Sequence, residues 1–310
     1  MREDRRVLIV AFDGLRPDMA TAERMPNLNS VRRKGVDFAD CRAVFPTETR
    51  VNQASLVTGR HPSGHGIVAN KFVDPTLGGG FINTSNFEAS SRADDALDGK
   101  LLHGESLGEV LGRSGGSLAV VGCGTAGGNR MLHHTAARRG EINVSAHGPE
   151  HTTTPDALAW LASRIGPPPA AAIPNEGRIE WVARAYREAV APERDPTVTI
   201  LWFSDPDVPY HYRGLASAEA DAGIRAADRA LGALVDWRRE SGRDDSLQII
   251  AMSDHGHVTA VGPALDVAAR LAAAGFKLAE SPGGDGDAVL VAGSCGSLYC
   301  RDVEAQAALA

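Results

Sequence analysis

The chain has 310 residues, of which 43% are hydrophobic and 23% are charged, as in an ordinary globular protein that can bury a sizeable core. Its formal net charge of −7 argues against a nucleic-acid polymer or a membrane surface as a partner, so an anionic ligand would need local positive charge or metal ions. The N-terminal apolar run is too short for a signal peptide, no segment reaches transmembrane length and the cysteines form no C-x-x-C pair, so we expect a cytoplasmic protein.

Short apolar runs rich in β-branched residues predict strands at 7–12, 117–122, 197–203, 247–252 and 288–293. The runs are continuous rather than alternating, which is typical of strands buried on both faces of a largely parallel sheet. Amphipathic patterns between them predict helices at 105–113, 154–165, 178–190 and 222–240. The alternation of strands and helices predicts an α/β fold, a largely parallel central sheet flanked by helices. Loop-like insertions at 71–100 and 124–153 are expected to form a lid or small cap over this sheet.

Three of the predicted strands run directly into residues that bind metals. The first strand ends at Asp13, the third is followed by Asp207 and His211, and the fourth is followed by Asp254 and His255. An aspartate after a strand is usually a turn or cap residue, but open parallel sheets bring their carboxyl-end loops together at one edge. Clustered carboxylates repel one another unless a cation compensates them, and mixed Asp and His ligands suit zinc best, with manganese or iron as alternatives.

The stretch FPTETRVNQASLVTG places Thr49 where a helix is about to begin. Thr49 can be a simple helix cap, or it can be a nucleophile if a metal or base ionises its hydroxyl. The free N–H groups of the helix would then face an incoming phosphate, and Asn52, one turn further on, could donate a hydrogen bond to a phosphoryl oxygen. Thr47 is the rival nucleophile, and the spacing Thr-x-x-Asn favours Thr49.

These residues resemble the type I phosphodiesterase/nucleotide pyrophosphatase family of the alkaline phosphatase superfamily. The order and spacing match through the stretches AFDGLRPDM, MPNLNSVRRKGVDF, FPTETRVNQASLVTGRHPSGHGIVANKF, DPDVPYHYRG and SDHGH. The resemblance implies an alkaline-phosphatase-like fold in which residues 1–310 form a single catalytic domain. It also implies a site with two zinc ions. The residues that would hold the first zinc are Asp13, Thr49, Asp254 and His255. The second zinc would be held by Asp207 and His211.

The implied activity is hydrolysis of a small-molecule phosphate or phosphonate ester, with no nucleic-acid polymer or membrane as a partner. Thr49 would displace the leaving group to form a phospho-threonine, and water would then hydrolyse that intermediate, while Asn52 binds a phosphoryl oxygen. A phosphodiester or nucleotide substrate, a phosphonate such as phosphonoacetate, and a phosphomonoester all remain open. The sequence does not define the oligomeric state.

Two departures from the family pattern bear on these expectations. The family supplies a further histidine to the second zinc from a His-Gly motif near its C-terminus, whereas no histidine follows His257 here. Either the chain lacks the family's C-terminal end or another residue, His257 or His65, takes the place of that ligand. Nucleotide-cleaving relatives carry an aromatic residue directly after the nucleophile, whereas this chain has Arg50, which could pair with a carboxylate or a second phosphate of the substrate.

Three rival interpretations compete with that of a hydrolase. The pattern Gly122-x-Gly124-x-x-Gly127 after a strand is typical of a dinucleotide-binding turn, but the residues that follow make a poor amphipathic helix. A sulfatase would need a Cys or Ser followed by Pro-x-Arg, which Cys41 lacks. A truncated, non-catalytic metal-binding relative remains the alternative of another class. Four further histidines are expected to be solvated loop residues: His133, His134, His147 and His151.

Overall fold

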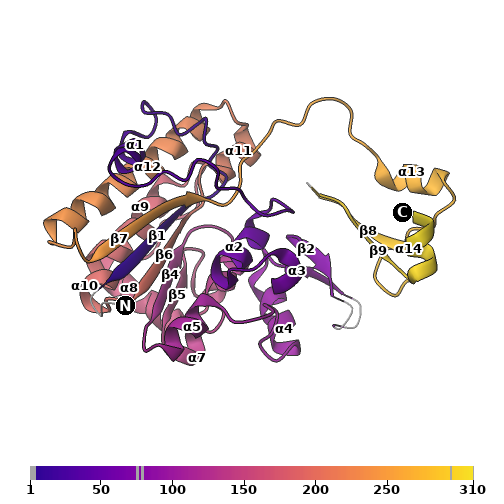
Figure 1. The fold of residues 1–310 in the computed structure, drawn as a ribbon, viewed down its shortest axis with the longest axis horizontal. Helices are drawn as coiled ribbons and strands as arrows, with labels where there is room; N and C mark the ends of the chain where they lie inside the picture. The colour runs from indigo at the N-terminus through magenta and orange to yellow at the C-terminus, as the bar shows by residue number, and fades with distance from the viewer. Residues whose placement is uncertain (1–4, 75–76, 78–79, 294, 310) are drawn as a thin grey trace.

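Five parallel strands form the central sheet of the protein, in the spatial order β5-β4-β6-β1-β7. The structure is a computed structural model that describes residues 5–74, 77, 80–293 and 295–309. The strands lie side by side within the main body, on the left of Figure 1. Their bounds are β1 (Arg6–Phe12), β4 (Leu118–Gly122), β5 (Ile142–Ser145), β6 (Val198–Phe203) and β7 (Leu247–Ser253).

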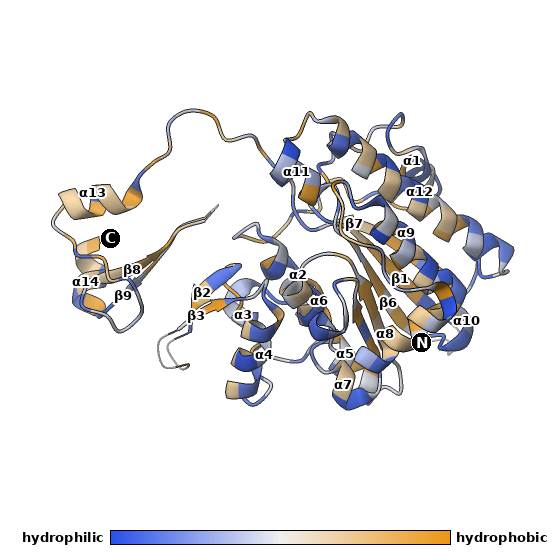
Figure 2. Cartoon of the chain, turned by 180° about the vertical axis from the view of Figure 1, so that it is seen from behind, coloured by the Kyte–Doolittle hydropathy of each residue, from blue (hydrophilic) through white to orange (hydrophobic). Residues whose placement is uncertain are grey.

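The two faces of the sheet carry two separate hydrophobic cores, because successive side chains of a strand point to opposite faces. In β1, Leu8, Val10 and Phe12 belong to one core, whereas Ile9 and Ala11 belong to the other. Burial on both faces explains the continuous apolar runs of β4, β6 and most of β1, whereas the edge strand β7 is mostly half-buried and its Ile250 is exposed, so the expectation of burial on both faces is wrong for β7. Figure 2 shows these strands as a hydrophobic centre flanked by helices with hydrophilic outer surfaces.

Helices from the second half of the chain, together with α1, cover the first core, and helices from the first half cover the second core. The first group is α1 (Pro26–Lys34), α8 (Pro155–Ile165), α9 (Glu176–Ala185) and α12 (Ala218–Glu240). The second group is α2 (Thr49–Thr58), α4 (Phe87–Ala96), α5 (Leu107–Arg113) and α6 (Ala126–Leu132). No helix in the described ranges is both long and apolar enough to cross a bilayer.

Short elements complete the main body. A two-stranded antiparallel ribbon, β2 (Lys71–Val73) and β3 (Phe81–Asn83), lies within the range expected as the first insertion, of which residues 75–76 and 78–79 lie outside the described residues. The remaining short helices are α3 (Pro62–His65), α7 (Ala136–Arg139), η2 (Pro149–His151), η3 (Tyr186–Val190), α10 (Ala191–Glu193) and α11 (Asp207–Arg213).

The C-terminal elements form a group of their own beyond β7. A stretch without regular structure leads from the end of β7 to α13 (Val267–Ala273), and the chain then forms β8 (Ala288–Val291), β9 (Ser297–Cys300) and α14 (Val303–Leu309). Figure 1 shows this group to one side of the main body. Tyr299 of β9 packs against the second core, so the group contacts the face that carries α2 and α4.

Two expectations about the elements require correction. The apolar run 288–293 is a strand, but β8 pairs antiparallel with β9 in a separate sheet and does not join the central one. Neither of the ranges expected to be loop-like insertions is loop-like, since 71–100 holds β2, β3 and α4, and 124–153 holds α6, α7, η2 and the edge strand β5. The pattern there is weak because β5 has only four residues, and its INVS sequence includes two buried polar residues, Asn143 and Ser145, whose side chains form hydrogen bonds with neighbouring segments.

Candidate active site

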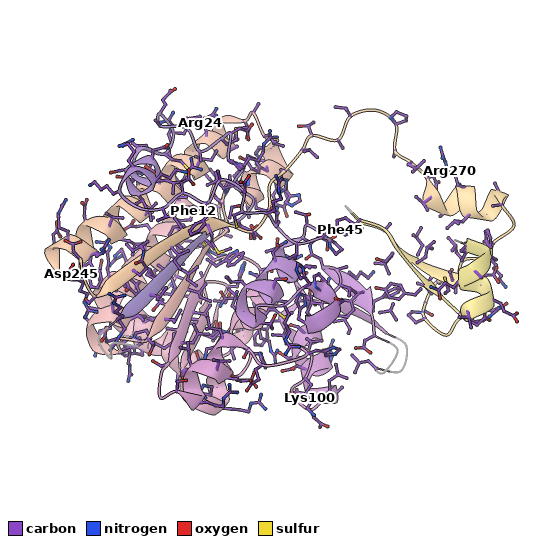
Figure 3. All side chains as sticks on the ribbon, in the orientation of Figure 1. Phe12, Arg24, Phe45, Lys100, Asp245 and Arg270 are labelled. Carbon is purple, nitrogen blue, oxygen red and sulfur yellow. The ribbon has the colours of Figure 1, made fainter. Side chains whose placement is uncertain are left out.

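Asp13 begins the site, directly after Phe12, the last residue of β1, which is labelled in Figure 3. Gly14 has a φ of +72°, and this left-handed conformation turns the chain away from the sheet. The Oδ2 atom of Asp13 accepts a hydrogen bond of 2.9 Å from Nε1 of Trp202 in the adjacent strand β6. Its buried Oδ1 atom has no hydrogen-bond partner among the described residues. One carboxylate oxygen is therefore held in place and the other is free to bind a cation.

Thr49 is the first residue of α2, and its side chain is buried, whereas the rival Thr47 is exposed. The Oγ1 atom of Thr49 lies 2.9 Å from Nε2 of His255. Glu48 precedes the helix in an extended conformation, so the chain enters α2 with the Thr49 hydroxyl directed at the loop after β7. Of the two candidate hydroxyls, the structure brings that of Thr49 to the candidate metal ligands.

Asp254 and His255 follow β7 and complete a first group of ligand atoms around Thr49. Asp254 Oδ1 accepts hydrogen bonds from the backbone N–H groups of Gly14 at 3.1 Å and of His255 at 3.0 Å, while the buried Oδ2 has no partner in the described part of the chain. The Nδ1 atom of His255 lies 3.0 Å from the Gly256 carbonyl, which leaves Nε2 directed inward. This Nε2 lies 3.4 Å from Asp13 Oδ1 and 3.5 Å from Asp254 Oδ2.

Asp207, His211 and His257 form a second group next to the first. Asp207 and His211 lie one turn apart on α11, with Asp207 Oδ1 3.4 Å from His211 Nε2. The Nε2 atom of His257, from the loop after β7, lies 2.6 Å from the same Asp207 oxygen. The backbone N–H of Asp207 donates to the Asp13 carbonyl at 3.0 Å, which fixes α11 against the end of β1.

His257 and His65, the two histidines that could replace the family's C-terminal histidine ligand, lie in different surroundings. His257 stands with Asp207 and His211. His65 is fully buried beside α2, where its Nε2 lies 2.9 Å from Ser55 Oγ and its Nδ1 accepts a hydrogen bond from the Ile67 N–H at 3.2 Å. Both ring nitrogens of His65 are in use, so its geometry is that of a structural residue.

Burial and crowding shift the pKa values of this cluster. Burial raises the pKa of Asp254 well above its usual range, and the Asp13 carboxylate adds to the rise. Burial alone would lower the pKa of His255, but the nearby carboxylates of Asp13 and Asp254 raise it to about 10. Burial opposes ionisation of Asp207 as well, but hydrogen bonds with His211 and His257 hold its pKa well below the usual range. In the absence of a cation, protons compensate the negative charge here.

A divalent cation fits this donor set better than protons do. Around His255 Nε2 lie carboxylate oxygens of Asp13 and Asp254 and the Thr49 hydroxyl, and Asp13, Asp207 and His255 also offer ligand atoms close enough to one another to hold one ion. The second group offers one carboxylate and two imidazoles. Among the described residues, one buried oxygen of Asp13 and one of Asp254 have no hydrogen-bond partner. Mixed nitrogen and oxygen donors of this kind bind zinc and other transition metals.

Asn52 and Arg50, the expected substrate-binding residues, both lie on the first turn of α2. The amide of Asn52 is tied to the backbone, since Nδ2 donates to the Glu48 carbonyl at 3.0 Å and Oδ1 accepts from the Val44 N–H at 3.0 Å. Burial lowers the pKa of Arg50, although the carboxylates of Asp13 and Asp207 act in the opposite direction. Its Nε has no hydrogen-bond partner within the described ranges.

A cavity of about 610 Å³ adjoins the ligand groups. Asp13 and Asp207 form one part of its wall, and Arg50, His147 and Arg178 line other parts. This volume falls within the usual range of roughly 300–1,000 Å³ for small-molecule sites. The cavity reaches the ligand groups at Asp13 and Asp207, and Arg50, the neighbour of Thr49 in the sequence, lines it as well.

The glycine-rich turn after β4 forms part of this cavity and is explained by close packing. A Cβ atom on Gly127 would meet the Thr84 carbonyl oxygen at 2.3 Å, and one on Gly124 would meet the Trp202 ring at 2.9 Å. Gly124 lines the cavity, and the helix that follows, α6, has only seven residues. The spacing that is typical of a dinucleotide-binding turn therefore serves packing against neighbouring segments here.

The sequence patterns did not indicate that Trp202, Arg178 and His147 belong to the site. Trp202 reads as one more apolar residue of a buried strand, although its indole N–H orients Asp13. Arg178 reads as one polar position of an amphipathic helix, although it is 8% exposed. Of the four histidines expected to be solvated loop residues, His133 and His134 are buried, so the expectation is wrong for them. His147 is exposed, but it also contacts Arg178 at the cavity wall.

Sequence comparison places most of the chain in one family. The family model described as type I phosphodiesterase / nucleotide pyrophosphatase matches residues 7–281. The chain is 27% identical over 270 residues to ectonucleotide pyrophosphatase/phosphodiesterase family member 7 of Rattus norvegicus, covering 86% of this chain and 53% of that protein. It is 25% identical over 256 residues to a venom phosphodiesterase of Macrovipera lebetinus, covering 82% of this chain and 26% of that protein. The chain thus spans a quarter to a half of the length of these relatives.

Solved structures share the fold. Murine ectonucleotide pyrophosphatase/phosphodiesterase 5, an inactive threonine-to-alanine variant in complex with AMP, matches with a TM-score of 0.62 and 20% identity over 99% of this chain and 70% of that one. Phosphonoacetate hydrolase from Sinorhizobium meliloti 1021, in complex with phosphonoformate, matches with a TM-score of 0.57 and 21% identity over 82% of this chain and 56% of that one. The predicted alkaline-phosphatase-like α/β fold is confirmed, and the chain belongs to the type I phosphodiesterase/nucleotide pyrophosphatase family.

Proposed function

We propose that this protein is a metal-dependent hydrolase of small phosphoric esters, of the phosphodiesterase/nucleotide pyrophosphatase type, with Thr49 as its nucleophile. One observation carries the proposal: the Thr49 hydroxyl lies within hydrogen-bonding distance of His255, at the point where the loops after β1 and β7 converge. Family membership supports the reaction class, since the relatives are named as phosphodiesterases and nucleotide pyrophosphatases.

Two divalent cations, zinc by preference, would occupy the two ligand groups. The first would be held by Asp13, Thr49, Asp254 and His255, with one carboxylate oxygen of each aspartate free of hydrogen bonds. The second would be held by three residues, Asp207, His211 and His257, and His257 would supply the ligand that the family takes from a later histidine. The bound cations would lower the pKa of the hydroxyl and neutralise charge on the phosphoryl oxygens.

The chain's own residues then carry out two displacements. In the first, the Thr49 hydroxyl releases its proton to solvent and Oγ1 forms a bond to phosphorus while the bond between phosphorus and the leaving-group oxygen breaks, which gives a phospho-threonine and a leaving group that takes a proton from solvent. In the second, a water oxygen bonds to phosphorus and releases a proton to solvent while the bond to Thr49 Oγ1 breaks, and the threonine oxygen takes up a proton, so that the hydroxyl is restored. The buried position of Thr49 limits attack by bulk water on the intermediate.

The first turn of α2 would bind the phosphoryl group. Thr49 begins a helix of ten residues, and the free N–H groups at such a helix start attract phosphate oxygens. The Asn52 amide nitrogen carries two hydrogens, one of which is used by the Glu48 carbonyl, so the second remains available for a phosphoryl oxygen. Arg50 adds positive charge at the cavity wall.

The two segments expected as insertions would act as the cap of a single catalytic domain. Ser85, Asn86 and Phe87 of the range 71–100 line the cavity, and residues between 124 and 153 line it as well: Gly124, Thr125, Ala126, His147 and His151. Because both segments contribute wall residues next to Asp13, they are placed to shield the reacting phosphorus from solvent.

The same ligand groups could also serve a phosphonate hydrolase or a phosphomonoesterase, since the structural neighbours hold AMP and phosphonoformate. The test combines elemental analysis of purified protein with hydrolysis of bis(4-nitrophenyl) phosphate and 4-nitrophenyl phosphate. We expect about two metal ions per chain and faster turnover of the diester than of the monoester. A chelator should abolish this turnover, and added zinc should restore it. Turnover of the monoester alone would make the protein a phosphomonoesterase. Bound metal without hydrolysis of either ester would make it the non-catalytic relative.

A further inference from the structure

Arg178 is a buried cation without a carboxylate partner. It lies on the first turn of α9 and is 8% exposed, yet among the described residues it takes part in no ion pair. Its Nε donates to the Pro169 carbonyl at 3.0 Å, and NH1 donates to Nδ1 of His147 at 3.3 Å. A buried guanidinium normally has a carboxylate or phosphate partner, because desolvating an unpaired charge is costly.

His147 holds this guanidinium through a defined tautomer. Its Nε2 lies 2.7 Å from the Gly124 carbonyl, so Nε2 carries the hydrogen and Nδ1 is the acceptor for Arg178. Of the five N–H donors of Arg178, two are used by Pro169 and His147, which leaves three on the terminal nitrogens. The guanidinium is thus fixed in position with its outer edge free.

No carboxylate in the described part of the chain forms an ion pair with Arg178. Burial raises the pKa of Cys123, the one acidic group that influences Arg178, to about 12, so its thiol is neutral near pH 7. Arg50 lines the same cavity, and its Nε also has no hydrogen-bond partner within the described ranges. Two guanidinium groups therefore face one cavity whose other side holds Asp13 and Asp207 of the ligand groups.

We infer that the cavity contains a subsite for a second anionic group of the substrate, a carboxylate or a phosphoryl group bound by Arg178. The inference rests on the proposed function, and it names the substrate class: phosphate or phosphonate esters that carry a further negative charge beyond the reacting phosphorus. The free edge of Arg178 matches the paired oxygens of either group. His147 is a positioning residue, which holds that edge toward the cavity.

Binding of three non-ester ligands tests the subsite independently of turnover. Propylphosphonate carries one anionic group, 3-phosphonopropionate adds a carboxylate at the far end, and propane-1,3-bisphosphonate adds a phosphoryl group. Calorimetry on the metal-loaded protein should show that at least one of the last two binds about tenfold more tightly than propylphosphonate, and the stronger of them identifies the second group. Equal affinity for all three overturns the subsite.

Arg178→Gln should remove this preference while leaving the affinity for propylphosphonate within about twofold. Arg184→Gln is the matched control, because Arg184 lies on the same helix and pairs with Glu188 on the protein surface. Equal loss of affinity for all three ligands in Arg178→Gln would assign Arg178 a purely structural role. If that variant does not fold, a crystal structure of the original protein with 3-phosphonopropionate decides: a carboxylate on Arg178 supports the subsite, and one in solvent overturns it.

Hydrolysis assays distinguish a failure of the subsite from a failure of the proposed function. The 4-nitrophenyl esters of methylphosphonate and of carboxymethylphosphonate share a leaving group and differ in one carboxylate. Hydrolysis of both without a preference for the second leaves the proposed function standing and contradicts the subsite. A binding preference that depends on Arg178, without hydrolysis of either ester, leaves the subsite standing and contradicts the proposed function.

Discussion

The hydroxyl oxygen of Thr49 lies 2.9 Å from Nε2 of His255, although the two residues are 206 positions apart in the sequence. The contact joins the first residue of α2 to the loop after β7, and Asp13 Oδ1 lies 3.4 Å from the same nitrogen. The loop after β1, the start of α2 and the loop after β7 thus come together around Nε2 of His255. The sheet produces this meeting because β1 lies between β6 and β7 and all three strands are parallel.

Replacement of the Thr49 hydroxyl tests its role as the nucleophile. Thr49→Ala should lower kcat for an aryl phosphodiester by at least about a thousandfold, because no other hydroxyl stands at that position. Metal content should stay nearly unchanged, since Asp13, Asp254 and His255 remain. Thr47→Ala is the matched control, because Thr47 is exposed on the same segment, and it should retain activity. Retained activity in Thr49→Ala would shift the attack to water or to Thr47.

His257 tests the composition of the second ligand group. His257→Ala should lower the metal content by about one ion per chain, because Asp207 and His211 alone make a weak site for zinc. His61→Ala serves as the control, since His61 is exposed beside α3. Elemental analysis after dialysis measures both variants. Unchanged metal content in His257→Ala would exclude His257 as a ligand.

Trp202 tests how Asp13 is oriented. Trp202→Phe keeps most of the buried aromatic volume but removes the N–H group that binds Asp13 Oδ2, so metal affinity should fall about 10- to 100-fold. Trp181→Phe makes the same chemical change away from the site, where the indole donates to the Gly166 carbonyl at 2.9 Å. Competition with a zinc-binding dye measures both, and an equal effect of the two substitutions would contradict the positioning role.

His65 should make the stability of the protein fall in acid. Burial lowers its pKa to about 4, and repulsion from His103 and His61 adds to the effect. Since the unfolded chain binds the proton more readily, the contribution of His65 to the free energy of unfolding is complete above about pH 6.5 and is lost as the pH falls toward 4. NMR titration of the imidazole resonances measures the pKa directly. Titration of His65 near 6.5 would contradict its buried, neutral state.

The strand ends explain how much of the site could be predicted from the sequence. Asp13, Asp207 and Asp254 each follow a continuous apolar run, and parallel strands bring such residues to one edge. The spacing of Asp207 and His211 is that of one helical turn, as α11 confirms. These patterns are local, and the parallel arrangement of the sheet supplies the rest.

Contacts that depend on tertiary packing could not be predicted in this way. His257 points at Asp207 only because the loop after β7 passes over α11, and no periodicity encodes that path. The charge of Arg178 is unusual only once its burial is known. The run 288–293 has the composition of a central strand, yet its partner is β9, because composition predicts a strand but not its neighbour.

Anomalous diffraction at the zinc absorption edge, from crystals of the metal-loaded protein, tests most directly whether the ligand groups hold cations beside the nucleophile. We predict one peak bounded by Asp13, Asp254, His255 and the Thr49 hydroxyl, at about 2.0–2.2 Å from each ligand atom, and a second peak between Asp207, His211 and His257. A map in which no peak borders the Thr49 oxygen would contradict the account.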